Sequence, residues 1–415
     1  MSTAAPEPLA VAGERKIQWV RRNMPVLRGL EHQFRDQQPF DGMAIAVSVH
    51  LEAKTAYLAL VLEAGGAAVS VTGSNPLSTK DDVVAALRAR GVAVFARHGA
   101  SPQQFKQDQL DALAGKPHIV IDDGGDLVHH LHEDARSCAS RVLGACEETT
   151  AGVVRNRARE AAGRLTFPVL AVNDAKMKHL FDNRYGTGQS VVNALMRTTN
   201  LNIAGTVFVV VGYGWCGRGI AACARGLGAR VVVCEVDDVA AIEAHMDGFE
   251  VAPLKEAVAA ARYIVTATGV RGTIGPDVLD ALADGAVLAN AGHFADEIDV
   301  AAMRDAATER TVVRENVESF ALAGGRSVSV VADGKIVNIA AGDGHPAEIM
   351  DTSFAVQALC AQFVAQGGLA EPSGRVLAVP ASVDRQVAAL RLASLGVRID
   401  TVSDAQRAYS AGYER

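Results

Sequence analysis

A glycine-rich turn in the middle of the chain constrains the fold more than any other feature. Gly212-Tyr-Gly214-Trp-Cys-Gly217 follows an apolar run over 206–211 and precedes an expected helix over 218–227. A strand, a tight turn and a helix in this order are typical of dinucleotide binding, because glycines let the backbone approach a pyrophosphate and the helix N-terminus attracts the anion. A second apolar run ends at Glu235, whose carboxylate can accept hydrogen bonds from ribose hydroxyls. The pattern predicts a Rossmann domain and favours NAD over NADP.

Length and charge narrow the possible function classes. With 415 residues, the chain is long enough for two domains of ordinary size. A net charge of −7 without Lys/Arg clusters argues against nucleic acid or a membrane surface as a partner and favours a small molecule. No apolar stretch reaches the ~18 residues of a membrane span and the N-terminus lacks signal-peptide features, which predicts a cytoplasmic protein. The six cysteines include no metal-type CxxC pair and are expected to be reduced structural thiols.

Apolar runs alternate with helical patterns on both sides of the turn. Before it, we expect strands over 43–50, 67–72, 92–96 and 118–121, separated by helices over 53–64, 80–90 and 102–113. After it, strands over 229–234, 263–267 and 286–289 are expected, with a helix over 276–282. The runs are continuously apolar, as in strands that are covered on both faces. The sequence predicts an α/β fold with two doubly wound parallel-sheet domains, the second being the Rossmann domain.

Polar residues gather where the predicted strands end. His50 ends the first strand, Asp122-Asp123-Gly-Gly-Asp126 follows another, and Glu147-Glu148-Thr149-Thr150 comes after a third apolar stretch. The segment 173–183 is dense in titratable groups. Open α/β sheets bind ligands at the carboxyl ends of their strands. A carboxylate, an imidazole and a lysine beside a nicotinamide could oxidise an alcohol and then move a proton.

A metal site is not expected from the histidine-rich segment. His129, His130 and His132 are close in sequence, but adjacent histidines on a helix or strand point apart, and no further ligand lies at helical metal spacing. The acidic segment 122–126 also lacks the full pattern of a calcium loop. We therefore expect no bound metal.

Several sequence blocks, read in order, carry a family resemblance. They are SNPLSTKDD (74–82), IDDGGDL (121–127), CEETT (146–150), VND (172–174), FDNRYGTGQS (181–190), VVGYGWCGRG (210–219), NAGHF (290–294) and VNIAAGDGHPAEIM (337–350). Over nearly the whole chain the sequence resembles the S-adenosyl-L-homocysteine hydrolases. It is most similar to their archaeal and thermophilic branch, which has threonine in YGTGQS and lacks a long C-terminal extension.

The resemblance implies a reaction. It implies that this chain hydrolyses S-adenosyl-L-homocysteine, or by our hypothesis its inosine analogue, reversibly to the nucleoside and homocysteine. Tightly held NAD oxidises the ribose 3′-hydroxyl, which acidifies the C4′ hydrogen and lets homocysteine leave from C5′. Water then adds to the alkene and the 3′-ketone is reduced again, so that NAD is regenerated in each turnover.

The resemblance also implies residue roles. The catalytic set would be His50, Asp123, Glu148, Lys178, Asp182 and His293. NAD would contact Thr149, Thr150, Asn183, Gly212, Gly214, Trp215, Cys216, Gly217, Glu235, Thr268, Asn290, Asn338 and His345. Substrate would contact Glu52, Lys54, Asn75, Thr79, Asp343, His345, Met350 and Phe354.

Within the catalytic set the resemblance separates two tasks. Lys178 and Asp182 would handle the 3′-hydroxyl proton while Glu148 holds the ribose hydroxyls. His50 and Asp123 would serve proton transfer at C4′ and at the 5′ leaving group. The histidines of NAGHF and GDGHP would close the site around ribose and base.

One departure from the animal enzymes leaves the base open. Those enzymes carry threonine and glutamate where this chain has Glu52 and Lys54 after His50. Because a lysine can only donate, it suits a 6-oxo purine such as hypoxanthine better than a 6-amino purine, unless Glu52 acts as the acceptor.

Other functions also remain open. The strongest alternative is a nucleoside-tailoring dehydratase, which would use the same oxidation, elimination and reduction to remove water. A catalytically silent NAD-binding regulatory protein and a simple dehydrogenase are weaker alternatives.

The resemblance sets the domain organisation that we expect. A substrate-binding domain would comprise 1–178 plus 350–375, and the NAD-binding domain would comprise 187–345. A C-terminal segment would follow over 376–415. Closure about hinges near 179–190 and 346–352 would keep water from the oxidised intermediate. The family also implies a homo-oligomer, either a tetramer or a dimer.

Overall fold

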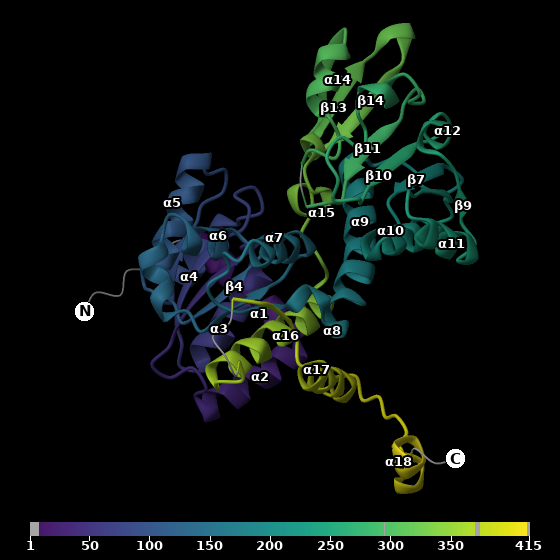
Figure 1. Cartoon of the computed structure of the whole chain (residues 1–415). Helices are drawn as coiled ribbons and strands as arrows, with labels where there is room; N and C mark the ends of the chain where they lie inside the picture. Colours follow the sequence, from purple (N-terminus) through teal and green to yellow (C-terminus); the bar gives the residue numbers. More distant parts are fainter. Residues whose placement is uncertain (1–7, 294, 370–373, 413–415) are drawn as a thin grey trace.

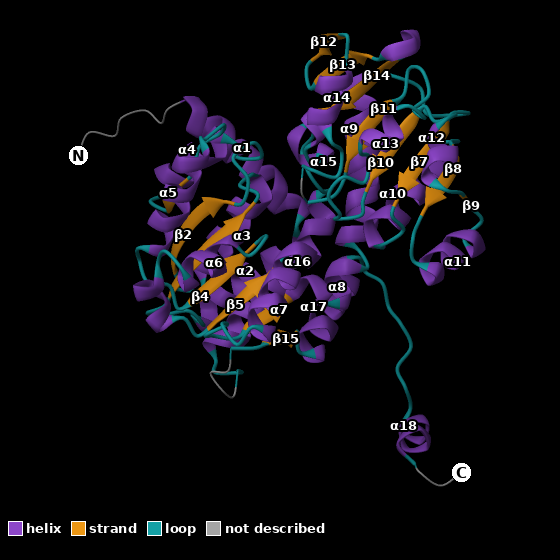
Figure 2. Ribbon diagram, turned by 45° about the horizontal axis from the view of Figure 1, so that its top comes forward, coloured by secondary structure: helices purple, strands orange, loops and turns teal. Residues whose placement is uncertain are grey.

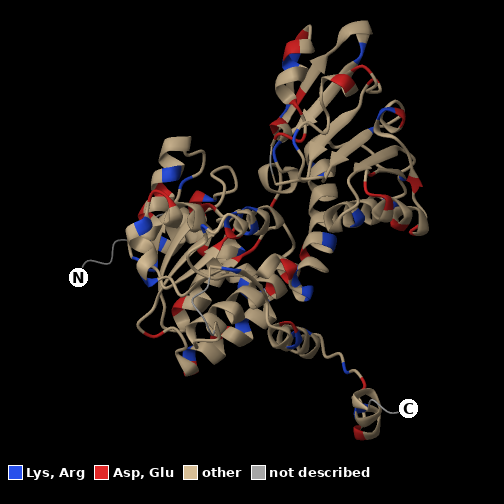
Figure 3. Cartoon of the chain, viewed as in Figure 1, with Lys and Arg blue, Asp and Glu red and all other residues tan. Residues whose placement is uncertain are grey.

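The computed structural model of the chain describes residues 8–293, 295–369 and 374–412. Figure 1 shows two lobes, each built around its own sheet. The chain forms most of the first sheet, crosses to build the second, and returns to complete the first. Basic and acidic residues are interspersed along the backbone of both lobes (Figure 3). No helix among the described residues is long and apolar enough to span a membrane.

The first sheet is parallel throughout, with the order β15-β6-β5-β4-β1-β2-β3. Its strands are β1 Ala44–Val49, β2 Ala68–Gly73, β3 Ala93–Phe95, β4 Ile119–Asp122, β5 Gly144–Glu147, β6 Val169–Ala171 and β15 Val376–Ala378. The strand order reverses between β1 and β4, where the two connections leave in opposite directions and open a crevice at the carboxyl edge. Residues 50 and 123 follow these two strands.

Helices cover both faces of the first sheet. They are α1 Pro8–Asn23, α2 Pro25–Gln37, α3 Ala53–Ala64, α4 Asp81–Ala89, α5 Pro102–Leu113, α6 Asp126–His132, α7 Thr150–Ala161, α8 Lys176–His179, α16 Ala347–Ala365 and α17 Ala381–Ser394. α16 contributes 13 buried residues and contacts α2, α3, α8 and α17. Its few charges and many small apolar residues suit a helix that is covered nearly all round.

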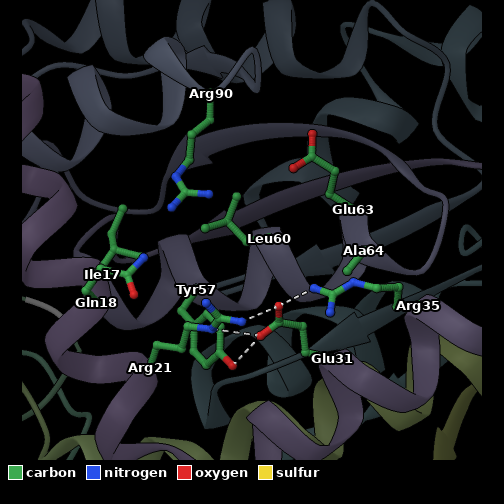
Figure 4. Close-up of a pocket in the computed structure, with 10 residues that line it drawn as sticks. All are labelled: Ile17, Gln18, Arg21, Glu31, Arg35, Tyr57, Leu60, Glu63, Ala64 and Arg90. Carbon is green, nitrogen blue, oxygen red and sulfur yellow. Dashed lines mark hydrogen bonds and ion pairs between the residues drawn. The ribbon is translucent and has the colours of Figure 1, made fainter. Parts of the chain in front are cut away.

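An ion network ties three of these helices together. Arg21 of α1, Arg35 of α2 and Tyr57 of α3 all donate to the buried carboxylate of Glu31 (Figure 4). Burial would raise the pKa of Glu31, but Tyr57 and the two guanidinium groups lower it below its usual value. The charge on Glu31 is therefore compensated in place.

The second sheet has the order β12-β13-β14-β11-β10-β7-β8-β9. Its strands are β7 Val207–Val211, β8 Arg230–Cys234, β9 Glu250–Val251, β10 Tyr263–Thr266, β11 Val287–Asn290, β12 Glu309–Arg314, β13 Val317–Ala321 and β14 Ser327–Val331. The helices are α9 Thr187–Thr199, α10 Trp215–Gly226, α11 Asp238–Met246, α12 Leu254–Val258, α13 Pro276–Leu279, α14 Val300–Ala306 and α15 Val337–Ala340. A second reversal lies between β7 and β10, beside the glycine turn.

Four details differ from the sequence expectations. β13 runs antiparallel to both β12 and β14, so the edge of the second sheet is not parallel. α10 begins at Trp215, three residues before the expected 218. α13 ends at Leu279, short of the expected 282. The boundary expected at 375 is wrong, because β15 pairs with β6 and α17 packs on α16, so both belong to the first lobe.

The last described helix, α18 Asp404–Ala411, lies away from both lobes (Figure 2). None of its residues is buried. Several large apolar side chains on this helix and on the segment before it are exposed, including Ile399, Val402 and Tyr409.

Candidate active site

The two lobes meet where their strands end. A Cβ built on Gly124, after β4, would lie 3.1 Å from His293 Nε2, after β11. Lys54 Nζ, from α3, donates to the Asp343 carbonyl oxygen across the same junction at 3.1 Å. The carboxyl edges of both sheets therefore face one site, as expected for ligands bound at topological switch points.

Lys178 is the centre of this site. Its Nζ lies 3.3 Å from Asp182 Oδ1 and 3.7 Å from Glu148 Oε1, and it donates to Asn183 Oδ1 at 2.9 Å. Lys178 sits on α8, and Asp182 opens the π-helical turn Asp182–Gly186 that leads into α9, so the two residues are one turn apart. All three charged groups are buried. The sequence-predicted trio is thus brought together.

The charges of this cluster are mutually dependent. Burial alone would lower the pKa of the Lys178 ammonium, but the Asp182 and Glu148 carboxylates raise it above its usual range. Burial would raise the pKa of Asp182, but Lys178 and His345 hold it well below its usual value. Burial raises the pKa of Glu148 to about 7, against the opposing effect of Lys178. Glu148 can therefore change protonation near neutral pH while the other two stay charged.

α16 contributes two polar residues that sequence reasoning missed. Ser353 Oγ donates to Asp182 Oδ2 at 2.8 Å, and Gln357 Nε2 donates to Glu148 Oε2 at 2.5 Å. Both residues are fully buried, one turn apart on the face of α16 toward the site. The sequence of α16 gives no signal for them, because the helix carries other polar residues such as Asp351 and Thr352. Glu148 Oε1 is left buried with no hydrogen-bond partner among the described residues.

His50 and Asp123 form a second group. His50 Nε2 lies 3.6 Å from Asp123 Oδ2, and His50 Nδ1 contacts Ser78 Oγ at 2.8 Å. Since the Ser78 hydroxyl donates to the Asn75 carbonyl, Nδ1 donates to Ser78 and Nε2 is left to accept a proton. Burial lowers the pKa of His50, with Asp123 opposing this. A neutral imidazole with a free Nε2 can serve as a base.

Asp123 is held by Ser74, whose hydroxyl donates to Oδ2 at 2.7 Å. Within the described ranges, Asp123 Oδ1 is buried and has no hydrogen-bond partner. Sequence reasoning missed both Ser74 and Ser78, although the block SNPLSTKDD contains them.

Two further buried acids shape the loops that carry Asp123 and Glu148. Glu147 Oε1 accepts the Gly124 and Thr149 amides at 2.9 and 3.0 Å, while Asp122 accepts the Asp123 and Val128 amides. Burial raises the pKa of Asp122 to about 7, and burial together with Asp122 raises the pKa of Glu147 well above its usual value. Through these hydrogen bonds the two adjacent acids fix the loops that follow β4 and β5.

His345 joins the second lobe to the Lys178 cluster. Its Nδ1 lies 3.2 Å from Asp182 Oδ1, and its Nε2 contacts Thr187 Oγ1 at 3.2 Å. Thr187 also donates to Cys216 Sγ at 3.6 Å, which connects the cluster to the glycine turn. Burial raises the pKa of Cys216, so the thiol is neutral at neutral pH.

The glycine turn has the geometry that a pyrophosphate requires. Gly212 has φ +96°, and a Cβ there would lie 2.9 Å from the Ala267 carbonyl oxygen. A Cβ on Gly217 would lie 1.9 Å from the Gly212 carbonyl oxygen, whereas a Cβ on Gly214 would meet no atom within 4 Å. The first and third glycines are therefore needed for packing, and the second leaves open space at the N-terminus of α10. The residues present fit NAD.

The other predicted NAD contacts surround this turn. Glu235, after β8, accepts the Tyr213 amide at 2.5 Å, which fixes its carboxylate beside the turn. Thr268, after β10, is held by buried Glu297, which accepts its amide and hydroxyl at 2.9 and 2.8 Å. Trp215 stacks on His179, with ring centroids 5.1 Å apart. The remaining contacts lie further along: buried Asn290 ends β11, and Asn338 of α15 donates to Ser190 Oγ.

The predicted base-binding residues are placed unevenly. Lys54 Nζ donates to Glu52 Oε2 at 2.9 Å and to the Asp343 carbonyl. The Asp343 carboxylate does not face this group, because its side chain is 86% exposed and pairs with Arg197. Asp343 thus presents its backbone oxygen, and not its carboxylate, to Lys54.

The other predicted contacts pack around the site. The Asn75 carbonyl accepts the Ser78 and Thr79 hydroxyls. Met350 and Phe354 belong to the apolar core of the first lobe. Thr149 caps α7 through Gly152, and Thr150 donates to Asn173.

The three neighbouring histidines have protein partners. His129 contacts Arg159, His130 contacts Asp134 and Gln109, and His132 contacts the Val128 carbonyl and Thr166. Within the part of the chain that the structure describes, no group of three or more His, Cys, Asp or Glu side chains could hold a metal ion.

Comparison with known proteins identifies the family. Residues 7–141 match the family described as S-adenosyl-L-homocysteine hydrolase, and residues 183–344 match its NAD binding domain. An adenosylhomocysteinase of Thermotoga maritima is 48% identical over 97% of this chain and 99% of its own length. An adenosylhomocysteinase of Pyrococcus abyssi is 49% identical over 98% and 96%. An S-inosyl-L-homocysteine hydrolase of Methanosarcina mazei is 46% identical over 98% of each. This chain belongs to the S-adenosyl-L-homocysteine hydrolase family.

Proposed function

We propose that this enzyme hydrolyses the thioether of a purine nucleoside and homocysteine, S-adenosyl-L-homocysteine or S-inosyl-L-homocysteine, reversibly and with NAD held in the second lobe. The observation that carries the proposal is the placement of Lys178 between Asp182 and Glu148, beside Asn183. Relatives of nearly equal similarity bear both substrate names.

The chemistry that NAD supplies when bound is reversible oxidation of a secondary alcohol. In our proposal the nucleoside 3′-hydroxyl lies against Lys178 and Asp182, which accept and return its proton. Glu148 Oε1, which has no hydrogen-bond partner among the described residues, accepts a hydrogen bond from a ribose hydroxyl and thereby orients the sugar. His345, held by Thr187, keeps Asp182 directed at Lys178.

The second proton transfer, at C4′ and at the leaving sulfur, is assigned to His50 and Asp123, which follow β1 and β4. His50 Nε2 is left to accept a proton, and the buried Oδ1 of Asp123 has no hydrogen-bond partner among the described residues. In our proposal they take the proton from C4′ and return one to the sulfur as homocysteine leaves, and later serve water addition.

The base lies, in this proposal, beside Glu52 and Lys54. Lys54 has three donors, of which Glu52 and the Asp343 carbonyl engage two, so one is free for a purine O6. Glu52 retains acceptor capacity for an amino group. Lys54 and Glu52 can therefore bind either hypoxanthine or adenine, and the two thioethers should be tested side by side.

The test is homocysteine release from both thioethers by the purified, NAD-loaded protein, measured as free thiol. We expect release from at least one thioether and loss of release in Lys178→Ala by about a thousandfold. Mass spectrometry of the nucleoside products separates the alternative: a product lighter by one water, with no thiol released, would contradict hydrolysis and indicate a dehydratase. Both relatives' names describe hydrolases.

We also propose a homo-oligomer in the cytoplasm. The exposed apolar side chains of α18 and of the segment before it would be covered by a second copy. The six cysteines are unpaired, which is the usual state of thiols in a reducing compartment. We assign nucleoside binding to the first lobe.

A further inference from the structure

The helix that carries Lys178 lacks a cap of its own. α8 spans only Lys176–His179, and Ala175 at its N-cap position has no side chain that can accept a hydrogen bond. The first amides of a helix need acceptors, and a single turn is not stable by itself in water. Something outside the local sequence must therefore hold α8.

Asp384 of α17 supplies the missing acceptor. Its Oδ2 accepts the Lys176 amide at 3.0 Å and its Oδ1 accepts the Met177 amide at 2.8 Å. Both carboxylate oxygens are therefore directed at the open end of a helix that lies more than 200 residues earlier. A carboxylate at a helix N-terminus is favourable for charge as well as for hydrogen bonding.

α17 is itself firmly placed. Val383 and Val387 are buried in the core of the first lobe, on either side of Asp384 along the helix. Further along, Arg391 lies 3.6 Å from the fully buried carboxylate of Asp351 on α16. Asp351 in turn accepts the Val26 and Leu27 amides of α2. Asp384 is thus presented from a rigid part of the lobe.

The opposite end of α8 is held by the second lobe. His179 stacks on Trp215, the first residue of α10, with ring planes 37° apart. Between these two supports, Lys178 must keep its ammonium within 3.3 Å of Asp182 and 3.7 Å of Glu148. If the single turn of α8 moved, the distances from the Lys178 ammonium to Asp182 and to Glu148 would change. The placement of the reacting ammonium therefore depends on the cap.

We propose that Asp384 is a positioning residue for Lys178: its carboxylate caps α8 and thereby holds the ammonium between Asp182 and Glu148. The inference rests on the proposed function, in which Lys178 moves the 3′-hydroxyl proton. It brings α17, which the sequence expectations placed outside both domains, into the active-site structure.

The experiment compares Asp384→Ala with Asp299→Ala in the full-length, NAD-loaded protein. Asp299 is the control because its carboxylate also caps a helix: it is the N-cap residue of α14 and accepts the Ala302 amide at 2.9 Å. We expect kcat to fall roughly tenfold to a hundredfold in Asp384→Ala with KM changed by less than about threefold, and to be unchanged in Asp299→Ala. Asp384→Glu, which keeps the carboxylate, should recover most of kcat.

Hydrogen exchange supplies a readout that does not depend on activity. In Asp384→Ala, amide exchange of the peptide that covers 176–179 should accelerate at least about tenfold, and in Asp299→Ala it should not. If Asp384→Ala does not fold, Asp384→Asn retains one acceptor oxygen and should give intermediate values.

Unchanged exchange in the 176–179 peptide, or a kcat within about twofold of the control, would overturn the inference. A wild-type protein that releases no homocysteine would contradict the proposed function instead, and the exchange result would still decide whether Asp384 holds α8.

Discussion

The Asp182 carboxylate is contacted by three side chains from three different segments of the chain. Its Oδ1 faces both Lys178 and His345, and its Oδ2 accepts from Ser353. The acid therefore touches α8, α16 and the segment before α16 at once. Because the attraction of Lys178 and the contacts with His345 and Ser353 outweigh burial, the pKa of Asp182 lies well below its usual value, so Asp182 stays ionised and keeps the ammonium of Lys178 charged.

Glu148 behaves in the opposite way and gives a pH prediction. Burial raises its pKa from 4.5 to about 7, so the folded protein holds a proton that the unfolded chain has released. The stabilisation from the protonated form is fully present below pH 4.5 and is lost as pH rises through 7. Between pH 4.5 and 7 the wild type should lose stability that Glu148→Gln keeps. The free energy of unfolding of the variant should therefore rise relative to that of the wild type, by on the order of 2 kcal/mol.

Urea denaturation between these pH values measures this difference. Glu348→Gln, which changes an exposed glutamate at the start of α16, is the control for general titration effects. A difference between Glu148→Gln and wild type that does not vary with pH would contradict the raised pKa.

Close backbone contacts decide how the helices after Lys178 pack. A Cβ on Gly219 of α10 would lie 1.7 Å from the Arg184 carbonyl oxygen, and a Cβ on Gly188 of α9 would lie 2.4 Å from the Gly219 carbonyl oxygen. α10 therefore rests directly on the π-helical turn that begins with Asp182. The glycine-rich sequence serves this crossing as well as the pyrophosphate.

Gly219→Ala should consequently destabilise the protein by about 2 to 3 kcal/mol and lower activity, because the turn that carries Asp182 must move. Gly226→Ala in the same helix is the matched control, since a Cβ there meets nothing within 4 Å. The control should be neutral or stabilising by up to about 1 kcal/mol. Thermal unfolding and homocysteine release measure both; equal melting temperatures for the two variants would contradict the packing argument.

Elements with strong local patterns were predictable from the sequence. The expected helix over 53–64 and the strand over 263–267 correspond to α3 and β10 almost residue for residue. β12 was not predictable, because all six of its residues are exposed and it carries no apolar run. The start of α10 was misplaced because glycine and tryptophan read as a turn, whereas the helix begins directly after Gly214.

The site was predictable mainly where residues follow strands or belong to recognisable blocks. Asp123 met both conditions, His50 follows a strand, and Asp182 belongs to a block. Lys178 was found because it lies in the segment 173–183, which is dense in titratable groups. Ser353, Gln357 and Asp384 met neither, because they lie on helices whose local pattern reads as ordinary. Their contribution comes from the tertiary arrangement, which brings α16 and α17 beside residues that lie 171 to 209 positions earlier.

At the scale of the whole molecule, α18 should matter for assembly more than for the fold. None of its residues is buried, so a chain that stops at Gly396 should unfold at the same temperature when it is compared in the same oligomeric state. Light scattering after size exclusion should show a smaller assembly, because the exposed apolar side chains of 397–411 would no longer bind a second copy. An unchanged mass would exclude this segment from the proposed interface.

The two crossings between the lobes lie side by side, since a Cβ on Gly186 would sit 2.9 Å from His345 Nδ1. The second sheet is thus an insertion into the first lobe, and the two connections that join it to that lobe are adjacent. Asp182 lies on the first connection and His345 on the second, with Asp182 Oδ1 and His345 Nδ1 3.2 Å apart. If the second lobe were transferred to another protein, the Asp182–His345 contact would be kept only when both connections were transferred with it. Sequence changes in the two lobes are therefore coupled through this contact.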